Sequence, residues 1–338
     1  MNSLPLFSDL DCHPKLIGIA RLAADADSLR EGHNVEYFTL ATRSLLSRVV
    51  SGRNLPFTWA INPYRGCEFA CKYCYARYTH EFMEMRDGVE FEQKIYVKQH
   101  AAELLRHDLR RVRPGEAIAL GTATDPYQPA ERRYEITRGI LQEFARHRGF
   151  ELGIVTKSNL IVRDLDLLRE VALNNSLSIH VTVTTMNVEL ARILEPRAPR
   201  PDSRIDAVRQ LSEAGINVGV SSSPVLPGIT DSPAGLEDVV RAAAAAGAHH
   251  IFAGPLFLKP CSAAVFLPFL DQHFPHLVEN YRQRYQDRSF LPPSYGKRIA
   301  QLIAQFRQKY GIKRADPRGT MYANKWPVRA LDEQLALF

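Results

Sequence analysis

The stretch NPYRGCEFACKYCYAR, residues 62–77, places three cysteines within eight positions. They are Cys67, Cys71 and Cys74, and the whole chain of 338 residues contains only five cysteines. The segment follows a β-rich run at residues 57–62 and contains Pro63 and Gly66, so we expect a loop. Clustered thiols in a reducing compartment usually bind metal or serve catalysis rather than form disulfides. This loop is therefore the first candidate for a functional site.

The overall composition is that of a globular protein. Hydrophobic residues make up 45% and charged residues 24% of the chain, and the formal net charge is +6. This rules out a disordered or fibrous chain, and the mild basic excess allows an anionic partner without requiring one. No apolar run approaches the roughly 18 residues of a membrane span, and the N-terminal residues do not resemble an export signal. We therefore expect a cytoplasmic protein.

Strand-like and helix-like segments alternate through the middle of the chain. Three predicted helices end at a glycine, Gly149, Gly215 or Gly247, and a β-rich run follows each. Asp202 or Ser203 is a candidate cap for one helix, and Asp231 or Ser232 for another. The alternation predicts a parallel sheet with right-handed crossovers, either doubly wound or an incomplete barrel. The six β-rich runs are residues 57–62, 117–121, 151–156, 178–184, 217–221 and 250–253.

The pattern suggests three parts. Residues 1–55 are mixed and polar, and we expect an N-terminal arm with a helical segment around residues 41–50. Residues 56–260 carry the repeated strand–helix pattern. Residues 261–338 are predicted to form a mainly helical and basic extension, with helices within residues 264–310.

Three interpretations of the cysteine spacing remain open from the residues alone. The thiols could be incidental core residues, since cysteine is often buried. They could bind a structural zinc ion, with His80 as the fourth ligand. They could also hold three irons of a [4Fe–4S] cluster and leave the fourth iron open to a substrate or cofactor.

The motif C-x3-C-x-aromatic-C, with Tyr73 before the last cysteine, resembles the signature of the radical S-adenosylmethionine (SAM) superfamily. The resemblance implies a partial (βα)6 TIM-like barrel that uses a [4Fe–4S] cluster and SAM. In this superfamily the reduced cluster cleaves SAM, and the resulting 5′-deoxyadenosyl radical abstracts hydrogen from a substrate. The cofactor supplies the difficult chemistry, and the protein positions it. A reducing electron donor is an implied partner.

Polar segments follow the predicted strands, where a barrel carries its working residues. The segment GTATDPYQPAE, residues 121–131, resembles the family element that contacts the SAM amino group, although its strict form is absent. Lys157 could meet the SAM carboxylate, and Tyr73 could stack on adenine. The full set of expected SAM contacts is Tyr73, Gly121, Thr122, Thr124, Asp125, Lys157, Thr185 and Asn187.

A narrower resemblance, over roughly residues 57–260, is to the spore photoproduct lyase-like branch, which is related to DNA repair photolyases. Glu195 and Arg204 lie in a block, EPRAPRPDSR, that is similar to this branch. They could form an ion pair that braces the fourth crossover or could reach SAM, and we expect the structural ion pair. The branch places a hydrogen-donor cysteine at the end of the second strand, where this chain has Thr122. A hydroxyl is a poor hydrogen donor to a carbon radical, so the known thymine-dimer reaction is in doubt. Cys261 is a candidate substitute.

Basic residues are concentrated near the C-terminus. Residues 297–329 contain nine Lys or Arg and one acid, Asp316, with Tyr310, Tyr322 and Trp326 interleaved. Basic and aromatic residues together suit a nucleic-acid strand, although a solvated basic face has the same composition. The sequence thus predicts a radical SAM enzyme, with damaged or modified nucleic acid as the candidate substrate. The alternative is a non-catalytic nucleic-acid-binding protein with a structural metal at the three cysteines.

Overall fold

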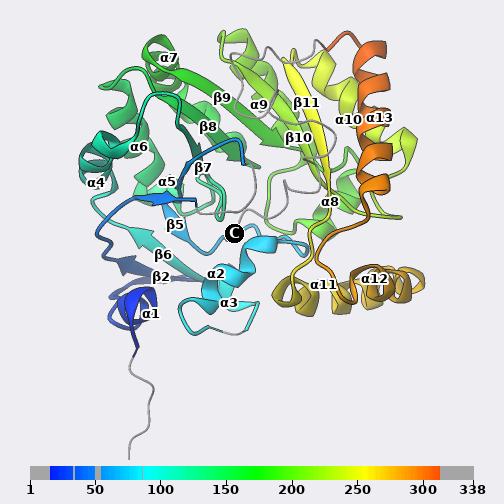
Figure 1. Ribbon diagram of the computed structural model, residues 1–338, viewed down its shortest axis with the longest axis horizontal. Coiled ribbons are helices and arrows are strands. Elements are labelled where there is room, and N and C mark those ends of the chain that lie inside the picture. The colour runs from blue at the N-terminus through cyan, green and yellow to red at the C-terminus, as the bar shows by residue number, and fades with distance from the viewer. Residues whose placement is uncertain (1–15, 33–34, 50–54, 86, 313–338) are drawn as a thin grey trace, which may run out of the picture.

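The computed structural model describes residues 16–32, 35–49, 55–85 and 87–312. Its main sheet has seven strands in the order β11-β10-β9-β8-β7-β4-β3 (Figure 1). Neighbouring strands from β4 to β11 pair in parallel, and β3 pairs antiparallel with β4. The strands are β3 (Leu46–Arg48), β4 (Trp59–Ile61), β7 (Ala117–Leu120), β8 (Glu151–Thr156), β9 (Ser176–Thr182), β10 (Val218–Val225) and β11 (His250–Pro255).

The strand order distinguishes the two folds that the sequence left open. From β4 to β11 the parallel strands follow one another in chain order, with no reversal. A doubly wound sheet would reverse its order at a switch point, whereas a barrel does not. The fold is therefore a partial TIM-like barrel, as expected. The six parallel strands match the six β-rich runs of the sequence.

Helices cover the outside of the sheet and bury its apolar side chains. The principal ones are α4 (Ala101–Asp108), α6 (Ile136–Ala145), α7 (Leu165–Asn174), α8 (Val188–Leu194), α9 (Pro201–Glu213), α10 (Pro233–Ala245) and α13 (Pro293–Lys309). The main core lies between these helices and strands that are almost wholly apolar, such as β7 with all four residues buried. Four-residue α5 (Glu131–Tyr134) and the 3-10 helices η2 (Leu109–Arg111) and η3 (Asn159–Asp164) complete the connections.

The helix ends were partly predictable. Ser232 caps α10, because its side chain accepts a hydrogen bond from the Gly235 amide, as expected of a Ser before Pro233. The expected caps Asp202 and Ser203 are wrong. They lie inside α9, whose cap position is Arg200 without a side-chain hydrogen bond. Pro201 begins α9 instead, because its ring presets a helical φ at the first turn.

The N-terminal segment differs from expectation. The helix predicted around residues 41–50 is wrong, since Leu46–Arg48 is strand β3, which pairs with β4 and buries Leu46. A second sheet, in the order β1-β2-β6-β5, joins this segment to the barrel (Figure 1). Its strands are β1 (Ser28–Gly32), β2 (Val35–Leu40), β5 (Tyr64–Arg65) and β6 (Lys94–Lys98), and α1 (Gly18–Ala24) precedes them.

The cysteine loop lies between β5 and short helices. These are η1 (Tyr75–Arg77), α2 (Tyr78–Glu81) and α3 (Glu90–Gln93). After β11 the chain forms α11 (Pro260–His273), η4 (Pro275–Leu277) and α12 (Val278–Tyr285), which lie together at the lower right of Figure 1, before α13 packs on β11. These helices confirm the helical prediction for residues 264–310. The basic tail from Lys313 lies outside the described residues.

Two cations of the basic C-terminal segment pair with acids near the start of α10. On α13, Arg298 pairs with Asp231 at 2.9 Å and Lys309 with Glu237 at 2.5 Å. These two side chains are therefore partly neutralised. No helix in the described ranges combines the length and hydropathy of a membrane-spanning segment.

Candidate functional site

The three clustered cysteines line one cavity of about 210 Å³. Its other walls come from the carboxyl ends of the parallel strands, where the sequence predicted polar segments. Among them are Gly121–Asp125, Thr156, Lys157, Thr182, Ser221, Ser223 and Pro255–Phe257. The barrel thus brings thiols, hydroxyls, a carboxylate and an ammonium group from five strands to one place.

Most of the predicted site residues line this cavity, but Thr185, Asn187 and Cys261 do not. Thr185 and Asn187 line a different cavity beside α8. The Thr185 hydroxyl accepts a hydrogen bond from the Asn187 amide at 3.1 Å, and the Asn187 side chain accepts one from Leu190 at 2.9 Å. Both side chains serve to begin α8, so this geometry does not support the ribose contacts expected of them. The predicted residues that line the cavity are Cys67, Cys71, Tyr73, Cys74, Gly121, Thr122, Thr124, Asp125 and Lys157.

The start of the cysteine loop is held by backbone contacts. Gly66 has φ of +80°, and a Cβ there would lie 2.6 Å from the Lys94 carbonyl oxygen. The next residue, Cys67, donates its amide to the Phe91 carbonyl at 2.9 Å. Glycine is required here because the chain turns with positive φ against another backbone segment.

Residues after β7 clamp the same loop. The Thr124 hydroxyl donates to the Gly66 carbonyl at 2.6 Å. The side-chain amide nitrogen of Gln128 donates to the same carbonyl and to the Thr124 hydroxyl. The side-chain oxygen of Gln128 accepts from the backbone amide of Glu68 at 2.9 Å. Thr124 therefore positions the cysteine loop, a role that the sequence did not reveal. Gln128 lies within the quoted segment 121–131, but only the structure gives it a partner.

Asn62 is a second positioning residue that sequence reasoning missed. Its side chain donates to the Thr122 hydroxyl at 3.2 Å and accepts from the Ala123 amide at 2.8 Å. The Tyr75 hydroxyl donates to the Thr122 carbonyl. These bonds orient the segment after β7 toward the cavity. The nearby Gly121 has φ of +93°, and a Cβ would lie 2.5 Å from the Val155 carbonyl oxygen.

Asp125 and Lys157 are linked across two strand ends. The Asp125 carboxylate accepts from the Thr156 hydroxyl and the Lys157 amide, both at 2.7 Å. Burial raises the pKa of Asp125, and these donors partly oppose that effect. Burial alone would lower the pKa of the Lys157 ammonium, but Cys71 and Glu195 raise it. Lys157 is thus a cation at the cavity wall beside the thiols.

A buried ion pair stands behind the cysteine loop. Arg204 lies 2.5 Å from the Glu195 carboxylate, and both side chains are at most 1% exposed. Glu195 also accepts from the Tyr73 hydroxyl and, at 3.1 Å, from Thr184. The Lys157 ammonium lies 5.7 Å from the centroid of the Tyr73 ring. The predicted structural ion pair is confirmed, and it anchors the tyrosine of the cysteine motif.

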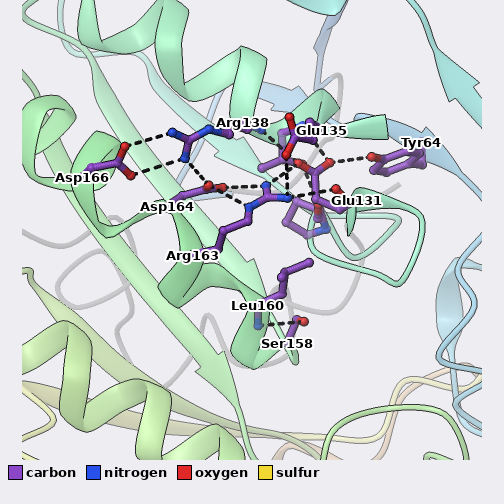
Figure 2. Close-up of polar contacts among 11 residues, drawn as sticks. Tyr64, Glu131, Glu135, Arg138, Ser158, Leu160, Arg163, Asp164 and Asp166 are labelled. Carbon is purple, nitrogen blue, oxygen red and sulfur yellow. Dashed lines mark hydrogen bonds and ion pairs between the residues drawn. The ribbon is translucent and has the colours of Figure 1, made fainter. Parts of the chain in front are cut away.

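A second ionic network joins the segments that follow β7 and β8 (Figure 2). Arg163 lies between Glu131 and Asp164, at 2.9 Å from each, and Arg138 bonds Asp164 at 2.6 Å. The Tyr64 hydroxyl donates to Glu131 at 2.5 Å. The network connects the segments that follow β7 and β8 with β5, so it positions two cavity walls relative to the cysteine loop.

Two other sequence candidates lie away from the cavity. Cys261 is in the first turn of α11, and its neighbour Ser262 donates to the Cys74 carbonyl at 2.8 Å. The Cys261 sulfur does not line the cavity. His80, the candidate zinc ligand, contacts the Lys94 carbonyl through Nε2 at 3.1 Å and packs on Phe91. His80 therefore does not complete a metal site with the cysteines.

The chemistry of the thiols fits an iron–sulfur cluster. Burial raises the pKa of Cys67, and Asp125 and the other two cysteines raise it further. Burial also raises the pKa of Cys71, although Lys157 opposes this. Such thiols become thiolates when a cationic metal centre compensates the charge.

The number of thiols also suits a cluster. A four-iron cluster spreads its thiolates over different irons, so the three thiols that line the cavity would hold three irons and leave one open. A structural zinc ion needs a fourth protein ligand, and His80 does not supply it.

Comparison with known proteins agrees with this geometry. The family model described as the radical SAM superfamily matches residues 61–241, more than half of the chain. An uncharacterized protein of Mycobacterium tuberculosis is 38% identical over 280 residues, covering 81% of this chain and 82% of its own length. An uncharacterized protein of Methanocaldococcus jannaschii is 28% identical over 221 residues, covering 65% of this chain and 78% of its own.

The fold also matches solved structures. A spore photoproduct lyase mutant with bound AdoMet and dinucleoside spore photoproduct superposes with a TM-score of 0.61 at 15% sequence identity, covering 80% of this chain and 79% of that one. At this identity the likeness concerns the fold alone. The family match over more than half of the chain, which agrees with the cysteine cavity, leads to one conclusion: the chain belongs to the radical SAM superfamily, whose members use a [4Fe–4S] cluster and SAM.

Proposed function

We propose that Cys67, Cys71 and Cys74 hold the [4Fe–4S] cluster and that SAM occupies the cavity beside it. The single observation that carries this proposal is that the three thiols and the polar strand ends line the same cavity. When bound there, cluster and SAM supply a 5′-deoxyadenosyl radical that abstracts hydrogen from a substrate. The protein's own part is to bind, orient and exclude water.

The cavity offers complementary groups to the two ends of the SAM methionine. Lys157 provides a cation for the carboxylate, and Asp125 provides a negative wall for the ammonium group. Gly121 lets the segment after β7 pass close to the Val155 carbonyl of β8, because a Cβ there would lie 2.5 Å from that oxygen. Tyr73 lines the cavity beside the cysteines, where its ring could stack on the SAM adenine, and Glu195 accepts a hydrogen bond from its hydroxyl.

The proposed substrate is a damaged or modified nucleic acid, with a peptide or small molecule as the second choice. The basic and aromatic C-terminal sequence supports this, as does the likeness in fold to an enzyme crystallised with a dinucleoside. Direct hydrogen donation by Cys261 is not part of the proposal, because its sulfur lies outside the cavity.

The test is anaerobic reconstitution with iron and sulfide, followed by SAM and dithionite, with 5′-deoxyadenosine measured by chromatography. We expect about four irons per chain, as the cluster formula requires, and 5′-deoxyadenosine formation that disappears in Cys71→Ala. Cys261→Ala is the matched control, since it removes a thiol outside the cavity and should keep its iron. Zinc in the purified protein, with no 5′-deoxyadenosine, would instead support a non-catalytic nucleic-acid-binding protein.

A further inference from the structure

A second cavity, of about 330 Å³, lies next to the proposed SAM cavity. The two cavities share one lining residue, Ala123. Residues of β3, β4, β5, β6 and α2 surround it, so it lies where the N-terminal sheet meets the barrel. Its charged lining residues are Arg48, Arg65 and Lys98, and no carboxylate is among its described lining residues.

The strand register explains why two of these cations face the same way. Arg65 pairs with Tyr96 across the antiparallel β5–β6 ladder, and Lys98 is two residues beyond Tyr96 on the same strand. Side chains two apart on a strand lie on one face, and directly paired residues share it. Arg65 and Lys98 are therefore diagonal neighbours on the face that lines the cavity.

No carboxylate acts on the pKa of either cation in the described part of the chain, and neither has an ion pair there. Lys98 is only 5% exposed. The Arg65 Nε is buried without a hydrogen-bond partner in the same part of the chain. Burial, with Arg65 nearby, lowers the pKa of Lys98 to about 7. Burying a charge without a partner is costly, so such a pair is retained at a cost to stability.

Two aromatic rings line the same cavity as these cations. Phe82 is 58% exposed, although it is a large apolar residue, and its ring packs edge-on against Tyr78 at 5.7 Å. Both residues line the cavity. Cations for a phosphate, with an exposed ring for a base, are the combination that binds single-stranded nucleic acid.

We propose that Arg65 and Lys98 form an anion subsite that binds a phosphate of the nucleic-acid substrate, with Phe82 beside the attached base. A phosphate in this cavity places the adjoining nucleoside next to Ala123, at the wall of the proposed SAM cavity. The inference rests on the proposed function for the kind of substrate, and it adds where the substrate is held. Two cations also suit phosphate geometry, since phosphate accepts several charge-assisted hydrogen bonds.

The test is calorimetric titration of the full-length, cluster-containing protein with SAM present. The probes are the DNA dinucleotide d(TpT), its uncharged methylphosphonate analogue, inorganic phosphate and a diglutamate peptide. We expect wild type to bind d(TpT) at least tenfold more tightly than the methylphosphonate. Lys98→Met should lose that preference, while Arg169→Met, which removes an exposed cation of α7 outside the cavity and outside the basic C-terminal segment, should keep it.

Each other outcome would overturn the proposal. Equal binding of d(TpT) and its methylphosphonate would show that no phosphate is recognised. An unchanged preference in Lys98→Met would exclude the cavity as its source. Binding of inorganic phosphate without d(TpT) would assign the cavity to the free ion, and binding of the diglutamate peptide alone would assign it to an acidic peptide. Because the readout is binding, a negative result leaves SAM cleavage by wild type untouched, and a failure of SAM cleavage leaves the binding result intact.

Discussion

Replacing the buried Lys98 by methionine should stabilise the protein. Lys98 is 5% exposed, and burial lowers the pKa of its ammonium from 10.5 to about 7. A tenfold change in proton affinity is worth about 1.4 kcal/mol, so the charged side chain costs up to about 5 kcal/mol of folding free energy. Methionine fills a similar volume without the charge. Since water can enter the cavity and solvate the ammonium, we expect a gain of about 2–3 kcal/mol at pH 6.

The effect has a defined pH dependence. Below pH 7, Lys98 is charged in both folded and unfolded states, so the cost is fully present. Between about pH 7 and 10.5 the folded protein releases the proton while the unfolded chain keeps it. Stability rises with pH wherever the unfolded state binds more protons. The free energy of unfolding of wild type therefore approaches that of Lys98→Met over this pH window. At pH 9 the difference should be less than half of its value at pH 6.

The assay is chemical denaturation of both proteins at pH 6, 7.5 and 9, with Lys297→Met as the exposed control. The control should differ from wild type by less than about 0.5 kcal/mol at every pH. A Lys98→Met variant that is less stable than wild type at pH 6 would refute the reasoning, since it would mean that the ammonium has a stabilising partner. A difference independent of pH would show that it reflects packing rather than charge.

Three further substitutions test the site. Gly121→Ala should cost at least about 2 kcal/mol more in thermal unfolding than Gly149→Ala, because both have positive φ but only at Gly121 does the new Cβ meet backbone, 2.5 Å away; equal costs would contradict this. Arg204→Met should cost about 3–5 kcal/mol in denaturant unfolding, because it leaves the Glu195 carboxylate buried without its cation; a neutral effect would show that Glu195 is protonated in the folded state. Lys157→Gln should raise the SAM dissociation constant about tenfold, measured by equilibrium dialysis, with the iron content unchanged; unaltered affinity would remove Lys157 from the SAM site.

Part of the site was predictable from the sequence because the residues that mark it lie close together in the chain. The spacing of Cys67, Cys71 and Cys74 lies within one loop, and loops that follow parallel strands meet at one end of a barrel. That rule correctly brought Asp125 and Lys157 to the cysteines. It failed for Thr185 and Asn187, because the chain after β9 turns at once into α8 and uses both side chains to begin that helix.

The sequence by itself determined the six parallel strands, the glycines that end their helices, the cysteine motif and the superfamily, because each is written in local pattern or spacing. Only the tertiary structure decided that the parallel strands lie side by side in chain order, that Leu46–Arg48 is a strand, and that the predicted pair of Glu195 and Arg204 is fully buried. It alone placed Arg65 and Lys98 on one face of the β5–β6 ladder. The physical reason is that strand pairing and ion pairing join residues far apart in the chain, and their free energy depends on burial and register that no local pattern contains.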